Sequence, residues 1–349
     1  MLIFYLIFYL ISIKLEYSDK YKIYLNELES IKRNLNSFKS EYGYTYIDVL
    51  ESNGKCMIIK ISYPRFFKGN NAFLITKVSE CLEVQEYFIQ QLKSYGYINF
   101  FPNINLIRVD IPFTYYMKEE EDFCHYQNIF KIFAYIYKKN ESNASPKAIQ
   151  DILSGKQETL YYADTKVIAN YNSRIMIYNQ DLNISDKYKD TYQNIIKEFP
   201  DLKKRIRIEV SKRIRRKPMG ISTFKKFDIF SLYFPRFKRY LLDNLLNIDD
   251  LEIFYKKKIE ELTNLLVEEK EKKRNFTYEA FLLEYINCIL DYEILRRALK
   301  ESTSNIKTYE NAITAVRKLL KGYEEKNNIM ILDVYNTIHK IFEYIDKIF

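Results

Sequence analysis

Two short stretches of the chain, IRVDI (107–111) and IRIEV (206–210), decide the fold. In each of them, apolar and charged residues occupy alternate positions. Side chains of a β-strand point alternately to its two faces, so each stretch predicts a strand with one apolar face and one charged face. A third stretch, RIMIY (174–178), has the same alternation. A sheet with an apolar side and a polar side is therefore expected.

The sequence around these stretches alternates between strand and helix patterns. Residues 79–95 have apolar residues three or four positions apart and are followed by Gly96, which is typical of a helix and its end. Further strands are expected at 10–17, 56–63, 72–76 and 160–162, and a further helix at 122–138.

Beyond about residue 230, only helical periodicity remains. It covers 249–273, 278–300, 308–324 and 331–349. We therefore predict an α+β fold: an antiparallel-sheet domain with flanking helices over 11–225, followed by an all-helical C-terminal domain over 226–349.

The first ten residues are almost wholly apolar and aromatic. They have no basic residues before the apolar run and no small-residue cleavage site, and they are too few to span a bilayer comfortably. We interpret residues 1–10 as an apolar extension that leads into the first strand, and we expect no stable membrane association. A membrane-associated interaction protein remains an alternative.

Composition excludes several classes of protein. The chain has 349 residues, 47% of them hydrophobic, with 7 Gly and 7 Pro, which fits a large folded core and no collagen-like or linker-like sequence. Its 4 Cys lie far apart without a CxxC spacing, and its 2 His, His125 and His339, cannot build a His-rich metal site or an HEXXH motif. With no phosphate-binding glycine loop either, an enzyme here would use carboxylates, tyrosines, basic groups and a hard metal ion.

Positive charge is concentrated in one segment. The net charge is +9, and between 203 and 226 the only acid is Glu209. Such a segment is typical of phosphate binding, and we expect DNA as the partner. A basic surface that merely keeps the protein soluble is the alternative. The expected DNA-binding residues are Lys203, Lys204, Arg205, Arg213, Arg215, Arg216 and Lys217.

The charged faces of the three alternating stretches suggest a chemistry. If the strands share a sheet, Asp110, Glu209, several arginines and Tyr178 converge on one surface. Carboxylates can hold Mg²⁺ or Mn²⁺, which polarises a phosphate, while a tyrosine hydroxyl attacks the phosphorus. The same alternation is also what a half-exposed antiparallel strand looks like, so a purely structural interpretation stays open.

Four segments in order resemble the replication proteins of the filamentous-phage gene II and gene X type. These are SYPRFFKGNNAFLI (62–75), LIRVDIP (106–112), TLYYADTKVIANYNSRIMIYNQ (159–180) and RIRIEVSKRIRRK (205–217). The family carries a "G-N-N" segment, an "xRxDI" strand, "TLYxG … xIxxYDK" and "LRxExxxK". The resemblance covers about residues 10–220.

The resemblance implies a rolling-circle replication initiator. Such an enzyme binds a replication origin, nicks one strand with a divalent metal and a tyrosine, leaves a 3′-OH for a polymerase and later rejoins the strand. By position, Tyr178 is the expected nucleophile, Asp110 and Glu209 are the expected ligands of Mg²⁺ or Mn²⁺, and Arg207 and Lys212 are expected to hold the scissile phosphate. The resemblance also implies origin DNA, single-stranded or supercoiled, host helicase and polymerase as partners, and the cytoplasm of a bacterial host as the location.

The chain departs from the family pattern at two positions. Gln180 and Asn183 stand where the family has Lys and Glu, and Asp181 is a candidate replacement for that acid. Tyr161, Tyr162 and Tyr171 are rival nucleophiles. The main alternative function is that of a non-catalytic DNA-binding protein, a degenerate initiator.

Overall fold

The structure is a computed structural model. It describes residues 10–17, 25–52, 55–117, 126, 129, 159–163, 172–215, 217–245, 247–285, 291–327 and 334–348. These residues form two compact units, each described separately here. Unit 1 holds the described residues up to 241, except 126 and 129, together with Ile348; unit 2 holds 126, 129 and those from 242 to 347.

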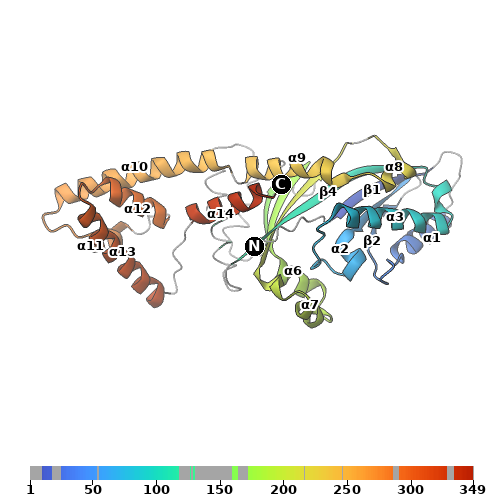
Figure 1. Ribbon diagram of the computed structural model, residues 1–349, viewed down its shortest axis with the longest axis horizontal. Coiled ribbons are helices and arrows are strands. Elements are labelled where there is room, and N and C mark those ends of the chain that lie inside the picture. The colour runs from blue at the N-terminus through green and yellow to red at the C-terminus, as the bar shows by residue number, and fades with distance from the viewer. Residues whose placement is uncertain are drawn as a thin grey trace. The chain divides into compact units, whose positions relative to one another are not determined.

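Unit 1 is built on an antiparallel sheet of eight strands in the order β2-β3-β1-β4-β7-β6-β5, with β8 paired to β4 (Figure 1). The strands are β1 (Leu10–Glu16), β2 (Ile47–Ser52), β3 (Cys56–Ser62), β4 (Asn103–Tyr116), β5 (Thr159–Ala163), β6 (Ser173–Asn179), β7 (Arg205–Arg213) and β8 (Met219–Gly220). The two sequence stretches that decide the fold lie in β4 and β7, which are neighbours at the centre of the sheet.

The helices of unit 1 surround this sheet. They are α1 (Leu25–Asn36), α2 (Tyr63–Lys68), α3 (Val78–Ser94), η1 (Tyr97–Asn99), α6 (Gln180–Lys187), α7 (Tyr192–Glu198), η4 (Pro200–Lys204), α8 (Ile221–Lys225) and α9 (Ile229–Asn244). Helix α3 ends where sequence predicts: Gly96 has φ +72°, a left-handed conformation that favours glycine.

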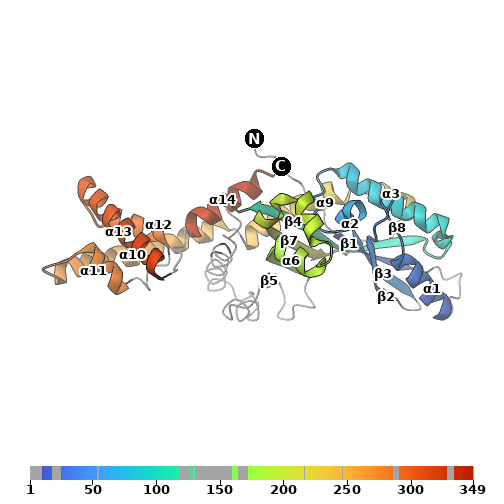
Figure 2. The same cartoon turned by 90° about the horizontal axis from the view of Figure 1, so that it is seen from below.

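Different helices cover the two faces of the sheet. On the apolar face, Ile111, Ile208 and other aliphatic side chains are buried, and Phe113 packs on Phe234 of α9 with ring centroids 5.6 Å apart. Helix α6 lies on the opposite side of the sheet from α9 (Figures 1 and 2). The alternation of the strands therefore separates an ordinary hydrophobic core from a polar layer.

Beside α6, a small apolar cluster joins α6 and α7 to the segment after α2. Its buried members are Ala72, Ile184, Ile195 and Leu202. The segment enters through Gly69, whose φ of +68° and close approach to the Tyr44 ring exclude a side chain at this position. Residues 70–72 are thereby placed next to α6.

Unit 2 consists of helices in the part of it that the structure describes in detail. They are α10 (Ile248–Lys272), α11 (Tyr278–Tyr285), α12 (Tyr292–Glu301), α13 (Ile306–Asn327) and α14 (Val334–Asp346). Asp291 links three of them: its carboxylate accepts hydrogen bonds from Tyr255 of α10, from the backbone of Glu293 in α12 and from the backbone of Tyr335 in α14. None of the described helices is long and apolar enough to span a bilayer.

The predicted fold class is confirmed: an antiparallel sheet with flanking helices is followed by a helical region. Two element predictions were wrong. Residues 72–76 form no strand: the Ala72 carbonyl accepts a hydrogen bond from Arg205. The backbone N–H groups of Ala72 and Thr76 donate to the side chains of Asn70 and Glu80, so these groups do not pair with a neighbouring strand. The single helix predicted at 278–300 is not continuous, because Asp291 caps a new helix, α12.

Other predictions lie outside the described residues. They are the apolar extension before Leu10 and, apart from Tyr126 and Ile129, the helix at 122–138.

Candidate active site

Register brings the charged sides of β4, β7 and β6 together. Asp110 pairs with Ser211, and Tyr178 pairs with Arg207, while Glu209 lies between these two pairs on β7. Directly paired residues of antiparallel strands share a face of the sheet. We call this surface the polar face, and its members are Arg108, Asp110, Thr114, Arg174, Tyr178, Arg207, Glu209 and Ser211.

Tyr178, the predicted nucleophile, is held at the end of β6. The next residue, Asn179, caps α6: its side chain accepts hydrogen bonds from the backbone of Asp181 and Leu182. This cap fixes the junction of strand and helix, and so the position of Tyr178. The Tyr178 hydroxyl donates to Oε2 of Glu209 at 3.3 Å, and both side chains are buried.

Glu209 has an unusual electrostatic environment. Burial raises the pKa of its carboxyl group to about 7, and the negative charge of Asp110 adds to the increase. The positive charges of Arg108, Arg207 and Arg174 oppose it. Glu209 can therefore gain and lose a proton near neutral pH, as a general base or acid must.

Asp110 is held from two sides. Its Oδ1 accepts a hydrogen bond from Arg108 Nε at 2.7 Å and another from the Ser211 hydroxyl. Its Oδ2, like Oε1 of Glu209, accepts no hydrogen bond from a described residue. Two neighbouring carboxylates with oxygens left to coordinate fit Mg²⁺ or Mn²⁺, which is commonly held by one or two carboxylates together with substrate phosphates.

A larger metal cluster is not seen: the described residues contain no group of three or more His, Cys, Asp or Glu that could hold an ion. Among the described residues of the site, Asp110 and Glu209 are the two carboxylates that could hold a metal, with water or phosphate oxygens as further ligands.

Arg207 is completely buried and connects the polar face to the segment after α2. Its guanidinium donates to Thr114 Oγ1 at 3.1 Å and to the carbonyl of Asn71 at 3.3 Å. The same carbonyl accepts from the side chain of Gln180 at 2.7 Å. Three of the segments that carry the sequence resemblance, 62–75, 159–180 and 205–217, thus meet at one backbone carbonyl.

Lys212 is not brought to this cluster. It pairs with Val109 and Ser173, which places it on the apolar side of the sheet. Its ammonium lies 3.7 Å from the ring centroid of Tyr240 and 5.9 Å from that of Phe237, both on α9. The reason is the strand alternation itself, since position 212 has the opposite parity from 207 and 209.

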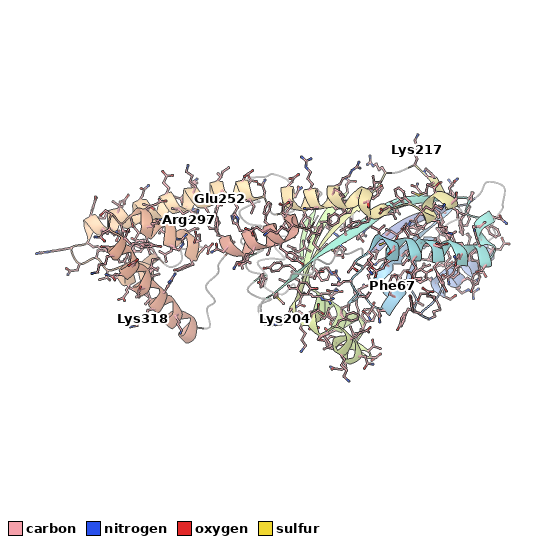
Figure 3. The ribbon with its side chains drawn as sticks, viewed as in Figure 1. Phe67, Lys204, Lys217, Glu252, Arg297 and Lys318 are labelled. Atoms are coloured by element: carbon pink, nitrogen blue, oxygen red, sulfur yellow. The ribbon has the colours of Figure 1, made fainter. Side chains whose placement is uncertain are left out.

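The predicted DNA-binding residues fall into two groups. Arg205 is buried, pairs with Asp201 and donates to the carbonyl of Ala72, so it does not belong to the surface. Lys204 is half-buried, and Arg216 lies outside the described residues. Exposed residues of this set are Lys203, Arg213, Arg215 and Lys217, and Figure 3 shows Lys217 projecting away from the ribbon.

The departures from the family pattern have structural roles here. Gln180 is buried against Asn71, and Asn183 accepts a hydrogen bond from Lys187 at 3.1 Å. Asp181, the candidate replacement acid, accepts from Tyr192 of α7 at 2.7 Å. Among the rival tyrosines, Tyr161 and Tyr162 lie on β5, opposite Met176 and Ile175, and Tyr171 is outside the described residues.

Sequence reasoning missed several residues of the site. Thr114 and Ser211 continue the same alternation along β4 and β7, so a longer reading of each strand would have found them. Lys187 could not be found in this way. It lies at the end of α6, and the negative charge of Glu209 acts on its ammonium.

Comparison with known proteins gives no identification: no family model, no curated protein and no solved structure matches the chain.

Proposed function

We propose that this protein is a DNA-nicking enzyme of the rolling-circle initiator kind, in which Tyr178 attacks a phosphodiester. The observation that carries the proposal is the hydrogen bond from Tyr178 to Glu209, a buried carboxyl group with a pKa of about 7. A tyrosine beside a proton acceptor, on a surface with three arginines, is a suitable arrangement for phosphoryl transfer.

In the proposed reaction, the Tyr178 oxygen forms a bond to phosphorus as its proton passes to Oε2 of Glu209. The bond from phosphorus to O3′ breaks, and the leaving oxygen takes up a proton from water to become a 3′-OH. The strand is then attached to Tyr178 through its 5′-phosphate. Rejoining is the reverse: the 3′-OH gives its proton to water as its oxygen attacks the phosphotyrosine, the bond from phosphorus to the Tyr178 oxygen breaks, and Tyr178 regains its proton from Glu209.

The positive side chains have a separate task. Arg108 and Arg174 lie close enough to Glu209 to act on its charge, and Arg207 lies between β4 and β6. Together they would stabilise the negative charge on the phosphate oxygens. Asp110 and Glu209 would hold Mg²⁺ or Mn²⁺, which when bound polarises the phosphate.

The product fits a replication role. A 3′-OH primes a polymerase, and a helicase would separate the strands; both would come from a bacterial host in whose cytoplasm the enzyme acts. This part of the proposal rests on the sequence resemblance.

A second candidate is a non-catalytic DNA-binding protein. Its support is that several polar groups of the site bind one another: Asp110 binds Arg108 and Ser211, and Arg207 binds Thr114 and Asn71. Tyr178 is also only 8% exposed. Such a layer would stabilise the sheet without any reaction.

The change Glu209→Gln separates the two candidates. Supercoiled DNA carrying the region around the gene is incubated with the protein and Mg²⁺ or Mn²⁺, and binding is measured in parallel with EDTA. The enzyme proposal predicts that wild type nicks, while Glu209→Gln binds equally well and has lost nicking by about 100-fold or more. Glu51→Gln, on the exposed edge strand β2, is the matched control and should nick normally. Equal nicking by Glu209→Gln and wild type would exclude Glu209 from the reaction.

A further inference from the structure

A row of basic residues crosses the sheet beside the candidate active site. By register, Asp48 of β2 pairs with Lys60 of β3, Lys60 with Ser12 of β1, Ser12 with Arg108 of β4, and Arg108 with Arg213 of β7. Arg108 is on the polar face, so all five lie on that face. We call Lys60, Arg108 and Arg213 the basic row.

The acids near this row are already engaged. Arg65 of α2 holds Asp48 through two hydrogen bonds, at 2.7 and 3.2 Å, and Asp110 accepts from Arg108. The side chain of Lys60 makes no hydrogen bond or ion pair with a described residue. The row therefore carries uncompensated positive charge where it crosses β3.

A further cation lies close to Lys60. Crowding by neighbouring atoms and the positive charges of Lys60 and Arg65 lower the pKa of Lys187, although the residue keeps an exposed surface. The charge of Glu209 has the opposite effect, so Lys187 is within electrostatic reach of both Lys60 and Glu209. Among the described residues, the Lys187 ammonium donates a hydrogen bond to Asn183, a neutral amide.

Placing the positive charges of Lys60 and Lys187 near each other lowers the stability of the folded protein unless an anion binds between them. Like charges at short distance repel one another, and a natural surface intersperses both signs. Lys60 of β3 and Lys187 of α6 are instead placed together at the border of the candidate active site, and Asp48, the acid opposite Lys60, is bound by Arg65. In the sheet order, β3 lies four strands from β6, which carries Tyr178. Neighbouring strands are about 4.8 Å apart, so Lys60 would reach a different phosphate from the one at Tyr178.

We propose that Lys60 and Lys187 form a second phosphate-binding site, which holds the backbone of single-stranded DNA on the same side of the sheet as the nucleotide that is cut. The proposal rests on the proposed function, because that function supplies the DNA strand. The lysines bind and orient the strand and take no part in the bond changes at Tyr178.

The test is equilibrium binding of a fluorescein-labelled single-stranded oligodeoxynucleotide, followed by anisotropy over a range of salt concentrations with EDTA present. Lys60→Gln, Lys187→Gln and the double variant are compared with Lys197→Gln, which removes the same charge from an exposed position of α7. Each site variant should bind about two- to fivefold more weakly than the control. The slope of log affinity against log salt should fall by about 0.7 for each lysine. Thermal unfolding shows whether the variants remain folded.

The outcomes distinguish this proposal from the proposed function. Binding by the double variant that equals Lys197→Gln in affinity and in salt slope would overturn the second phosphate site, whatever the nicking result. Weaker binding with the reduced slope supports it, even if wild type fails to nick and the enzymatic proposal is lost. A wild-type protein that binds no single-stranded DNA would overturn both.

Discussion

The hydroxyl of Tyr178 donates a hydrogen bond to Oε2 of Glu209, 3.3 Å away on the neighbouring strand. The carboxyl group of Glu209 is buried, next to Asp110, and has a pKa of about 7. A phenol thus faces a proton acceptor that titrates near neutral pH. The fold creates this pair by placing β6 beside β7 and by capping α6 directly after Tyr178.

The raised pKa of Glu209 predicts a pH-dependent stability. The ordinary value for the group is 4.5, so between pH 4.5 and about 7 the folded protein keeps a proton that the unfolded chain has released. The contribution of Glu209 to stability is therefore greatest below pH 4.5 and falls as pH rises to about 7. In Glu209→Gln this loss is absent.

The measurement is urea unfolding of both proteins in EDTA at pH 5 and pH 8. The stability of Glu209→Gln relative to wild type should be greater at pH 8 than at pH 5, by up to about 3 kcal/mol. Glu51→Gln should show no such change. A constant difference between the two pH values would contradict the raised pKa.

Arg207 should be essential for the fold of the sheet. Replacing it by Leu leaves the Thr114 hydroxyl and the Asn71 carbonyl without this donor and removes a positive charge near Glu209. We expect a loss of about 3 kcal/mol or more in the free energy of unfolding at pH 8. Arg213→Gln, at an exposed position of the same strand, should change it by less than about 0.5 kcal/mol. Similar values for both variants would show that the buried contacts of Arg207 contribute little.

Exposed and buried residues of the predicted DNA-binding segment should have different roles. Changing exposed Arg215 and Lys217 to Gln should weaken binding of single-stranded DNA and reduce its salt slope by about 0.7 per residue, with no change in Tm. Arg205→Gln should instead lower the Tm, because Arg205 is buried against Asp201 and Ala72. Anisotropy and thermal unfolding measure the two effects. The reverse pattern would place Arg205 at the DNA and count against the burial argument.

Asp291 should hold the helical unit together. Asp291→Ala removes the cap of α12 and the acceptor for Tyr255 and for the first turn of α14. We expect a cost of about 2 to 4 kcal/mol and faster hydrogen exchange in α12 and α14. Asp249→Ala, at an exposed position in the first turn of α10, is the control. Unchanged protection of α14 in Asp291→Ala would refute the role of this carboxylate.

A second polar cluster, near Asp291, also connects helices of unit 2. Glu252 accepts a hydrogen bond from Tyr335 and lies 3.2 Å from Nε2 of His339, while Arg297 lies over the Tyr335 ring at 4.4 Å. Glu252 and Arg297 are labelled in Figure 3. These contacts join α10, α12 and α14. They tie the last helical pattern of the C-terminal region, α14, to α10 and α12.

Alternation along a strand was enough to predict much of the sheet. Asp110, Tyr178, Arg207 and Glu209 were assigned to one face, because a period of two is strict within a strand. The same rule places Lys212 on the other face, although the resemblance assigns it to the phosphate. The family pattern gives only residue types and spacing, so it does not show on which face of the sheet Lys212 lies.

Other features depend on contacts between distant segments. The 72–76 stretch looks like a strand by its residues, yet the Ala72 carbonyl accepts a hydrogen bond from Arg205, far away in the chain. The carbonyl just before it, that of Asn71, accepts from Arg207 and Gln180. The sequence around Lys187 does not indicate that this residue lies near Glu209. Its position follows from that of α6, where Ile184 packs in the cluster with Ala72 and Leu202. Propensity and periodicity describe neighbours in sequence, so neither feature was predictable.

The most direct test of the account is capture of the covalent intermediate on Tyr178. A single-stranded oligodeoxynucleotide from the origin region, labelled at its 3′ end, is incubated with the protein and Mg²⁺ or Mn²⁺, and the products are separated under denaturing conditions. We predict a protein–DNA adduct with wild type that maps to the peptide containing Tyr178, and no adduct with Tyr178→Phe. An adduct of equal yield with Tyr178→Phe would assign the reaction to another tyrosine, and no adduct with either protein that binds the oligonucleotide would contradict the proposed enzyme.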